Sequence, residues 1–275
     1  MITININPVA FSLGAFDVRW YGIMVALAVV AVIVISLLEA RRVGLAEEHI
    51  YSVGLWAIIG GVVVSRLLHV IDKWDYYMAN PAQIIGFEGL TVYGAVLGAL
   101  LAVLIYCWVK KISFWLIGDV IAPGAILGQA IGRIGCIMNG CCYGLHTSLP
   151  WGVVYTNPDS YCPFDGPVQP TQIYHLIWNL IGFGILWSLR RRQLKPQGSL
   201  FLLYLALYAA GDLSIRFVRV GEPFLFGLQQ AQLIGIIILV VTVPWLIVRM
   251  LRARTQAVIT ESSSKVNRKE RNRGA

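Results

Sequence analysis

Residues 132 to 144 carry the side chains of this sequence that are best suited to binding an anion. They read Gly-Arg-Ile-Gly-Cys-Ile-Met-Asn-Gly-Cys-Cys-Tyr-Gly and follow a long apolar run. An arginine in such a place, Arg133, is costly in hydrocarbon unless an anionic or polar group receives it. The four glycines allow a tight turn and close approach to a neighbouring helix or a ligand. The segment is therefore a candidate site, with Arg133 and Asn139 as its polar groups.

A second charged group follows further along the chain. Asp212, Arg216 and Arg219 are spaced i, i+4, i+7, which places them on one face of a helix and lets Asp212 pair with Arg216. One net positive charge remains. Together with Arg133 it would suit a phosphate or carboxylate, because a planar guanidinium binds such groups through two donors. The alternative is a structural ion pair with Arg219 extending its side chain to water.

The elements that carry these residues are membrane spans. Hydrophobic residues make up 57% of the chain, charged residues 13%, and the mean hydropathy is +0.70, which excludes an ordinary soluble domain. The predicted fold is an all-α, polytopic membrane helical bundle. Windows long enough to cross about 30 Å of hydrocarbon lie near residues 20–38, 52–71, 90–109, 113–135, 170–189, 199–217 and 231–248.

Basic residues give the orientation of these seven spans. Of 22 Lys and Arg residues, 16 fall on one side of the arrangement, which predicts an outer N-terminus and a cytoplasmic C-terminus. The formal charge of +8 is then a topology signal and does not indicate nucleic-acid binding, since no folded domain presents the basic residues. The remaining six are Arg19, Arg66, Lys73, Arg133, Arg216 and Arg219.

The chain has the organisation of a single membrane domain over residues 1–257. Pro, Gly, Asn and Asp accumulate at about 136–168, which predicts a small extracytoplasmic head. Residues 258–275 are rich in Ser, Asn, Lys and Arg, which is typical of a disordered tail lying against anionic inner-leaflet lipid.

In this topology polar groups of five spans reach the outer face, which predicts a cavity there. For Tyr21 or Tyr93 taken alone, an interfacial aromatic belt is the alternative. The groups are Tyr21, Tyr93, Arg133, the pair Gln172 and Tyr174, and the segment from Asp212 to Arg219.

The cysteines and histidines predict no metal site, because no pair of histidines has ligand spacing on one helix. Cys107 lies in a span, and the other four cysteines fall in the predicted head. An oxidising compartment would allow a disulfide from Cys162 to Cys136, Cys141 or Cys142.

Gly132 to Gly144 resembles the signature of the prolipoprotein diacylglyceryl transferase family, usually Gly-Arg-x-Gly-Asn-Phe-x-Asn-Gly-Glu-x-x-Gly. Further segments resemble family motifs in the same order over about 200 residues, and five ordered motifs with seven spans make a specific match. These segments are Arg19-Trp20-Tyr21-Gly22, Glu88 to Gly98, Trp151-Gly152-Val153-Val154 and Pro170-Thr171-Gln172-Ile173-Tyr174.

The resemblance implies a bacterial inner-membrane enzyme without a cofactor, its active site toward the outer leaflet. It would transfer the diacylglyceryl group of phosphatidylglycerol to the lipobox cysteine thiol of prolipoprotein signal peptides and release glycerol phosphate. Arg133, with Arg216 or Arg219, would hold the lipid phosphate and stabilise the leaving group. Tyr93 would assist deprotonation of the thiol. The remaining lipid-binding positions would be Tyr21, Asn139 and Gly144.

The chain also departs from the family pattern. Tyr93 stands where many members carry His, and Cys136 and Cys141 replace the Asn and Glu of the signature. Asp212 and Arg216 exchange the charges of the usual Arg-x-x-x-Glu-x-x-Arg. Two alternatives therefore remain: a paralogue acting on another thiol or phospholipid, and a non-enzymatic transporter or lipid-binding protein.

Overall fold

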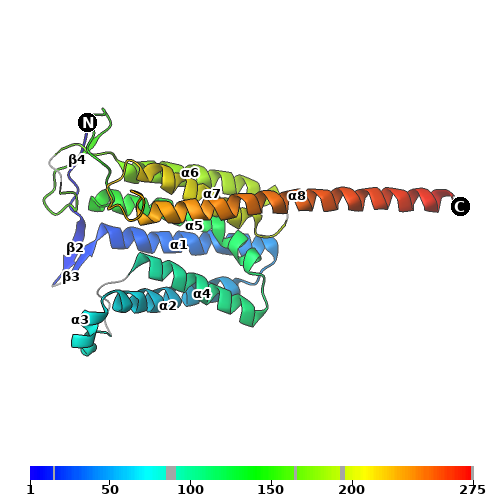
Figure 1. Ribbon diagram of the computed structural model, residues 1–275, viewed down its shortest axis with the longest axis horizontal. Coiled ribbons are helices and arrows are strands. Elements are labelled where there is room, and N and C mark those ends of the chain that lie inside the picture. The colour runs from blue at the N-terminus through cyan, green and yellow to red at the C-terminus, as the bar shows by residue number, and fades with distance from the viewer. Residues whose placement is uncertain (15, 85–90, 164–165, 193–195, 274–275) are drawn as a thin grey trace. The chain divides into compact units, whose positions relative to one another are not determined.

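The computed structural model describes residues 1–14, 16–84, 91–163, 166–192 and 196–273, and most of them are helical (Figure 1). A short helix, α3 (Trp74–Ala79), and two single 3-10 turns, η1 (Pro81–Gln83) and η2 (Arg190–Arg192), accompany the long helices. The long helices are α1 (Trp20–Val43), α2 (Glu47–Asp72), α4 (Val92–Lys110), α5 (Phe114–Asn139), α6 (Thr171–Leu189), α7 (Ser199–Arg216) and α8 (Gln230–Arg273).

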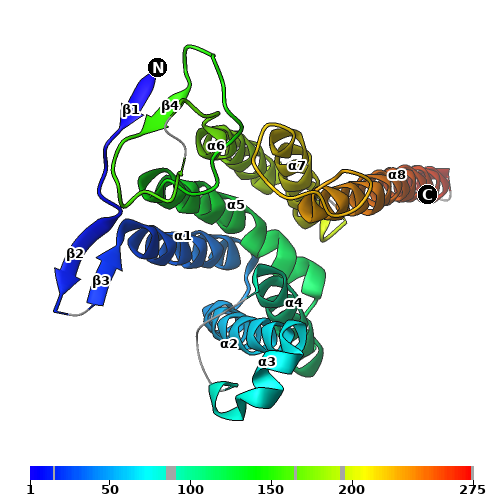
Figure 2. The ribbon, with the colours of Figure 1, turned by 60° about the vertical axis from the view of Figure 1, so that its left-hand side comes forward.

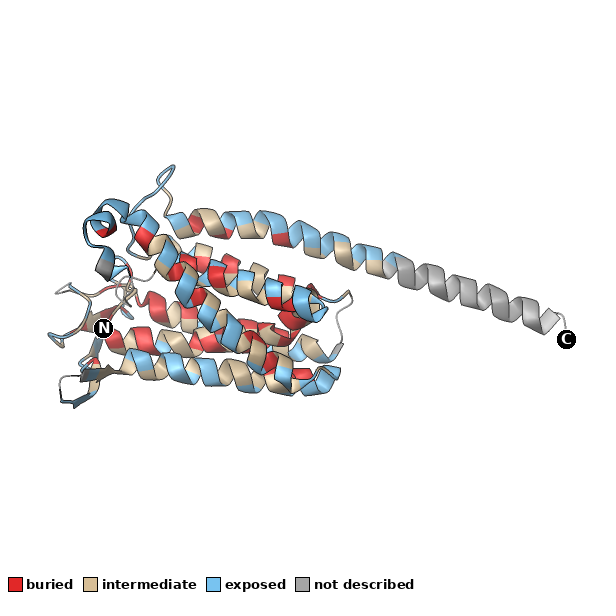
Figure 3. Ribbon diagram, turned by 90° about the horizontal axis from the view of Figure 1, so that it is seen from below, coloured by how far each residue is buried: buried red, intermediate tan, exposed pale blue. Residues whose placement is uncertain are grey.

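Within the described residues, six helices are long and apolar enough to cross a membrane: α1, α2, α4, α5, α7 and α8. The chain is a polytopic helical membrane protein, as its composition predicts. Many large apolar side chains are exposed on these helices, such as Leu55, Ile58 and Val240, as expected of surfaces that face lipid. Buried and exposed residues alternate along the helices (Figure 3).

Helix α6 is as long as α4 but less apolar. It buries four polar side chains, those of Thr171, Gln172, His175 and Asn179, and these lower its mean hydropathy. A helix that carries polar groups on a buried face remains compatible with a span, because those groups turn away from lipid.

Four short strands, which the sequence did not predict, accompany the helices of this mostly helical chain. Strand β1 (Ile2–Ile4) pairs in parallel with β4 (Val153–Tyr155), and β2 (Val9–Leu13) pairs antiparallel with β3 (Phe16–Arg19). Figure 2 shows β1 beside β4 and the β2–β3 hairpin leading into α1. Strands of three to five residues are too short to show a clear period of two in the sequence.

The chain divides into two compact units, the first of which comprises Met1–Val32 and Ile121–Ala275. Here α6 packs against α7, and α7 against α8. The α5 residues Ile126 and Ala122 form a buried cluster with Leu186 and Leu200. Helices α1 and α5 also approach closely, since a Cβ added at Gly128 would lie 3.2 Å from the carbonyl oxygen of Ala28. This packing fixes the end of α5 against the start of α1.

The second unit, Ile33–Val120, is built around the pair α2 and α4. Glycines permit their contact: a Cβ at Gly60 would lie 2.7 Å from the carbonyl oxygen of Gly98. Small residues of this kind let two helix backbones meet inside a membrane. Ser65 Oγ donates to the carbonyl of Thr91 over 2.7 Å, next to the start of α4.

The structure gives secondary structure in the predicted head and in the predicted tail. Helix α5 continues to Asn139, so residues 136–139 are helical, and strand β1 pairs with β4 inside the predicted head. The backbone of residues 258–273 is helical as part of α8, which ends at Arg273. No Gly or Pro interrupts residues 253–273, so nothing in the backbone forces that helix to stop earlier.

Candidate functional site

Arg133 lies on the last two turns of α5, where the helix ends at Asn139. Its side chain is half-buried, and its guanidinium makes no hydrogen bond or ion pair with any residue that the structure describes. Arg133 is therefore a cation available to a ligand.

The chain turns sharply after α5, and two glycines make this turn possible. Gly140 has φ +69°, a left-handed conformation in which an added Cβ would collide with Ser160. At Gly144 an added Cβ would lie 2.6 Å from the carbonyl oxygen of Val218. Gly144 pairs with Arg219 as an isolated antiparallel bridge. The predicted lipid-binding position Gly144 thus connects the signature to the segment after α7.

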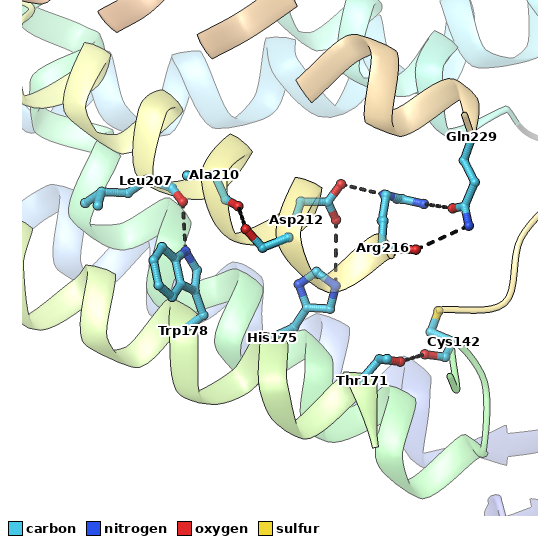
Figure 4. Close-up of polar contacts among 10 residues, drawn as sticks. Cys142, Thr171, His175, Trp178, Leu207, Ala210, Asp212, Arg216 and Gln229 are labelled. Carbon is cyan, nitrogen blue, oxygen red and sulfur yellow. Dashed lines mark hydrogen bonds and ion pairs between the residues drawn. The ribbon is translucent and has the colours of Figure 1, made fainter. Parts of the chain in front are cut away.

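Two side chains at the start of α6 donate hydrogen bonds to the backbone of the turn that follows α5. Thr171 Oγ1 donates to the carbonyl oxygen of Cys142 over 2.6 Å (Figure 4). Gln172 Nε2 donates to the carbonyl oxygen of Cys141 over 2.8 Å and to Tyr155 Oη over 3.2 Å. Both α6 side chains are fully buried. Because backbone groups of the turn are bonded to a helix, the turn is fixed in place.

The predicted ion pair at the end of α7 is present. Arg216 Nε lies 2.6 Å from Asp212 Oδ2, and Arg216 Nη1 donates to Gln229 Oε1 over 3.2 Å. His175 Nε2 of α6 lies 3.7 Å from the other oxygen, Asp212 Oδ1, and both residues are buried (Figure 4). Arg216 is thus occupied by residues of the protein.

Arg219, one turn beyond, differs from Arg216. Its guanidinium makes no hydrogen bond or ion pair with a described residue, as for Arg133. Both arginines lie within electrostatic reach of Cys142. Hydrogen bonds from Cys136 and Cys141, together with these positive charges, lower the pKa of the Cys142 thiol. The structure therefore brings two unpaired cations to one thiol on the turn.

Tyr21 and Asn139 lie in the same region. A Cβ at Gly135 would lie 3.3 Å from the Tyr21 Cα, and Tyr21 is within electrostatic reach of Arg133 and of the thiols on the turn. Asn139 is buried, its carbonyl oxygen accepts the N–H of Tyr161 over 3.1 Å, and its side-chain Oδ1 has no hydrogen-bond partner in the described structure. An unpaired buried acceptor is costly, which is common at sites that receive a ligand.

Tyr93 belongs to the second unit, at the start of α4, and is 39% exposed. The first residues of its motif, from Glu88 to Leu90, lie outside the described residues. Its assignment as the group that assists thiol deprotonation stays a prediction.

Two features of the site were missed from the sequence. The first is His175 beside Asp212, because nothing in the sequence shows which helices are neighbours. The second is a cluster of three thiols, those of Cys136, Cys141 and Cys142, with sulfurs within 4.8 Å of one another. Their proximity in sequence was the available signal. The disulfide from Cys162 that an oxidising compartment would allow is not formed among the described residues.

Comparisons with known proteins point to one family. Residues 8–248 match the family model described as prolipoprotein diacylglyceryl transferase. A phosphatidylglycerol–prolipoprotein diacylglyceryl transferase of Dehalococcoides mccartyi is 44% identical over 250 residues, covering 90% of this chain and 96% of the relative. A protein of the same name from Listeria monocytogenes is 33% identical over 271 residues, covering 96% and 98%.

Proposed function

The chain belongs to the prolipoprotein diacylglyceryl transferase family, and from this premise we propose that Arg133 and Arg219 hold the lipid phosphate during its reaction. The enzyme transfers a diacylglyceryl group from phosphatidylglycerol to prolipoprotein in lipoprotein maturation. The observation that carries the assignment is that these two guanidinium groups, near one turn, have no hydrogen-bond or ion-pair partner among the described residues.

The acceptor in this proposal is the lipobox cysteine of the prolipoprotein signal peptide. Its thiol loses a proton, and the resulting thiolate attacks the glyceryl carbon that carries the phosphate ester. A sulfur–carbon bond forms, the carbon–oxygen bond breaks, and the electron pair leaves on the phosphate oxygen of glycerol phosphate. Negative charge therefore develops on the phosphate.

Arg133 and Arg219 suit that change of charge. Guanidinium donors placed in advance around a phosphate stabilise the leaving oxygen as its charge grows. In a site with little water such donors act more strongly than in bulk solvent. Their contribution is to the transition state as well as to lipid binding.

Arg216 takes a positioning role in this scheme. It is bonded to Asp212 and Gln229, and Gln229 Nε2 in turn donates to the carbonyl oxygen of Arg219 over 3.1 Å. The ion pair therefore orders the segment that carries Arg219. Arg216 and Arg219, which the sequence could not rank, therefore take different roles: Arg216 positions the segment and Arg219 binds the phosphate.

The other predicted positions complete the proposed lipid site. Tyr21 would position the headgroup, and the amide nitrogen of Asn139 would donate to a phosphate oxygen or to the peptide, while its unpaired Oδ1 would accept a hydrogen bond from the peptide. Gly144 acts through the backbone, because it lets the turn pair with Arg219. Tyr93 is the candidate for assisting thiol deprotonation.

In the membrane, we take α6 as a seventh span beside the six more apolar helices. An odd number of spans agrees with an outer N-terminus and a cytoplasmic C-terminus, given the basic residues at the ends of α1, α4, α6 and α8. The ends of α5 and α7 and the start of α6 then lie toward the outer leaflet of the bacterial cytoplasmic membrane.

The test is a purified assay with phosphatidylglycerol vesicles and a lipobox peptide, read by mass spectrometry for diacylglyceryl addition at cysteine. We expect addition by the wild type and its loss in Arg133→Ala and Arg219→Ala. Arg41→Gln is the matched control, since Arg41 is exposed and pairs only with Glu47 across a surface ion pair. Equal activity of Arg133→Ala and the control would refute the phosphate assignment.

A further inference from the structure

Three thiols, one in the last turn of α5 and two on the turn that follows it, form a cluster with the composition of a metal site. The sulfurs of Cys136, Cys141 and Cys142 lie within 4.8 Å of one another, and all three are free. Cys136 is buried and the other two are half-buried. We propose that these three cysteines, as thiolates, bind one thiophilic divalent cation of the Zn²⁺ class.

The distances favour this ligand. Zinc–sulfur bonds are about 2.3 Å long and tetrahedral, so sulfurs that share one ion lie roughly 3.8 Å apart. A cluster whose largest separation is 4.8 Å reaches that geometry with small side-chain movements. Thiolate ligands select soft and borderline cations over Mg²⁺ or Ca²⁺. Three protein ligands leave the fourth position to water or to another ligand.

The backbone holds the cluster in place without an ion. The N–H of Cys141 donates to the carbonyl oxygen of Cys136 over 3.2 Å, which closes the end of α5. The carbonyl groups of Cys141 and Cys142 accept hydrogen bonds from Gln172 and Thr171. Because the turn is ordered by buried side chains of α6, a cation binds ligands that are already assembled.

The surrounding charge also suits a bound cation. Three thiolates and one divalent ion carry a net charge of −1, and the Arg133 and Arg219 guanidinium groups act on Cys142 from nearby. Buried charge is tolerated where opposite charge lies close to it.

Direct binding tests the proposal, and it does not depend on transferase activity. The purified full chain in detergent, kept reduced with a phosphine, is titrated with Zn²⁺ against a chromophoric chelator. We expect one ion per chain, and with Co²⁺ as a second probe we expect thiolate-to-cobalt charge-transfer absorption. Cys142→Ser should weaken Zn²⁺ binding roughly 100-fold, since even loss of an outer partner of a metal ligand costs 10- to 100-fold.

Cys162→Ser is the matched control. Cys162 lies in the same head, packed beside Tyr155, and is outside the thiol cluster. Its replacement should leave Zn²⁺ affinity unchanged. Circular dichroism of each variant shows whether the helices are retained.

A second measurement uses only the wild type and so does not depend on how a variant folds. Alkylation followed by peptide mass spectrometry should show Zn²⁺ protecting Cys141 and Cys142 while leaving the modification of Cys162 unchanged. Absence of stoichiometric binding by the wild type would overturn the proposal. So would unchanged affinity in both Cys141→Ser and Cys142→Ser.

Discussion

The ends of α5 and α7 lie in one unit and both carry arginines. The two ends differ in whether the arginine side chain has a partner within the protein. At the end of α7, Arg216 is bonded to Asp212 and Gln229. At the end of α5, Arg133 has no hydrogen-bond or ion-pair partner among the described residues, and Asn139 Oδ1 is buried without a hydrogen bond. A paired arginine stabilises the fold, whereas an unpaired one in the last two turns of a membrane helix is explained by a ligand.

The largest effect should come from Arg133→Ala. We expect kcat/KM for diacylglyceryl transfer to fall by roughly 10²- to 10³-fold, the range seen when one preorganised donor to a developing charge is removed. The melting temperature in detergent should change little, because the side chain makes no internal hydrogen bond. The mass-spectrometric assay and a thermal unfolding curve measure both. A large loss of stability would mean that Arg133 supports the fold, which would break the comparison.

Arg219→Ala sharpens the comparison within the end of α7. Arg219 resembles Arg133 in lacking a side-chain partner, so its loss should lower kcat/KM by roughly 100-fold. Stability should stay close to that of the wild type. A KM increase with unchanged kcat would assign Arg219 to lipid binding alone and leave Arg133 as the group that stabilises the leaving phosphate.

Arg216→Ala should show the opposite pattern. Removing this arginine leaves Asp212 buried without its main partner, which we expect to cost about 2 kcal/mol of stability. Activity should fall less than in Arg219→Ala when both are measured well below their melting temperatures. The double variant Asp212→Asn, Arg216→Gln should recover part of the stability, because neither charge is then left unpaired.

Gly144→Ala tests the connection between the two helix ends. Its new Cβ would lie 2.6 Å from the carbonyl oxygen of Val218, so the paired backbones must separate, at about 1–3 kcal/mol. Gly132→Ala is the control, since nothing lies within 4 Å of a Cβ there. Thermal unfolding of the two variants should differ accordingly. Equal melting temperatures would show that the turn adjusts freely.

A smaller effect than these is expected for Thr171→Val, which keeps the side-chain shape and removes the hydrogen bond to Cys142. We expect a loss of about 1 kcal/mol, typical of a single buried hydrogen bond. Ser188→Ala, which removes a comparable hydrogen bond to Ile185 near the exposed end of α6, should cost less. Unfolding curves in detergent would give the loss of stability of each of the two variants relative to the wild type.

Local sequence patterns were enough to predict most of the helices of this protein and one of its ion pairs. Apolar windows of about 20 residues predict helices because hydrocarbon leaves backbone groups no other partners. The i, i+4 spacing predicts the pair Asp212 and Arg216, which the structure contains. The strands β1 and β4 were missed because about 150 residues separate them and each has three residues.

The features of the site that the sequence did not predict depend on how helices contact one another and on the turn that follows α5. The neighbourhood of His175 and Asp212 depends on how α6 packs against α7, and the thiol cluster depends on a left-handed residue, Cys142, just beyond a helix end. A sequence lists the charges that a helix face carries, but which of them find a partner is decided by neighbouring helices. That is why Arg216 and Arg219 are equivalent along the chain and distinct in the folded protein.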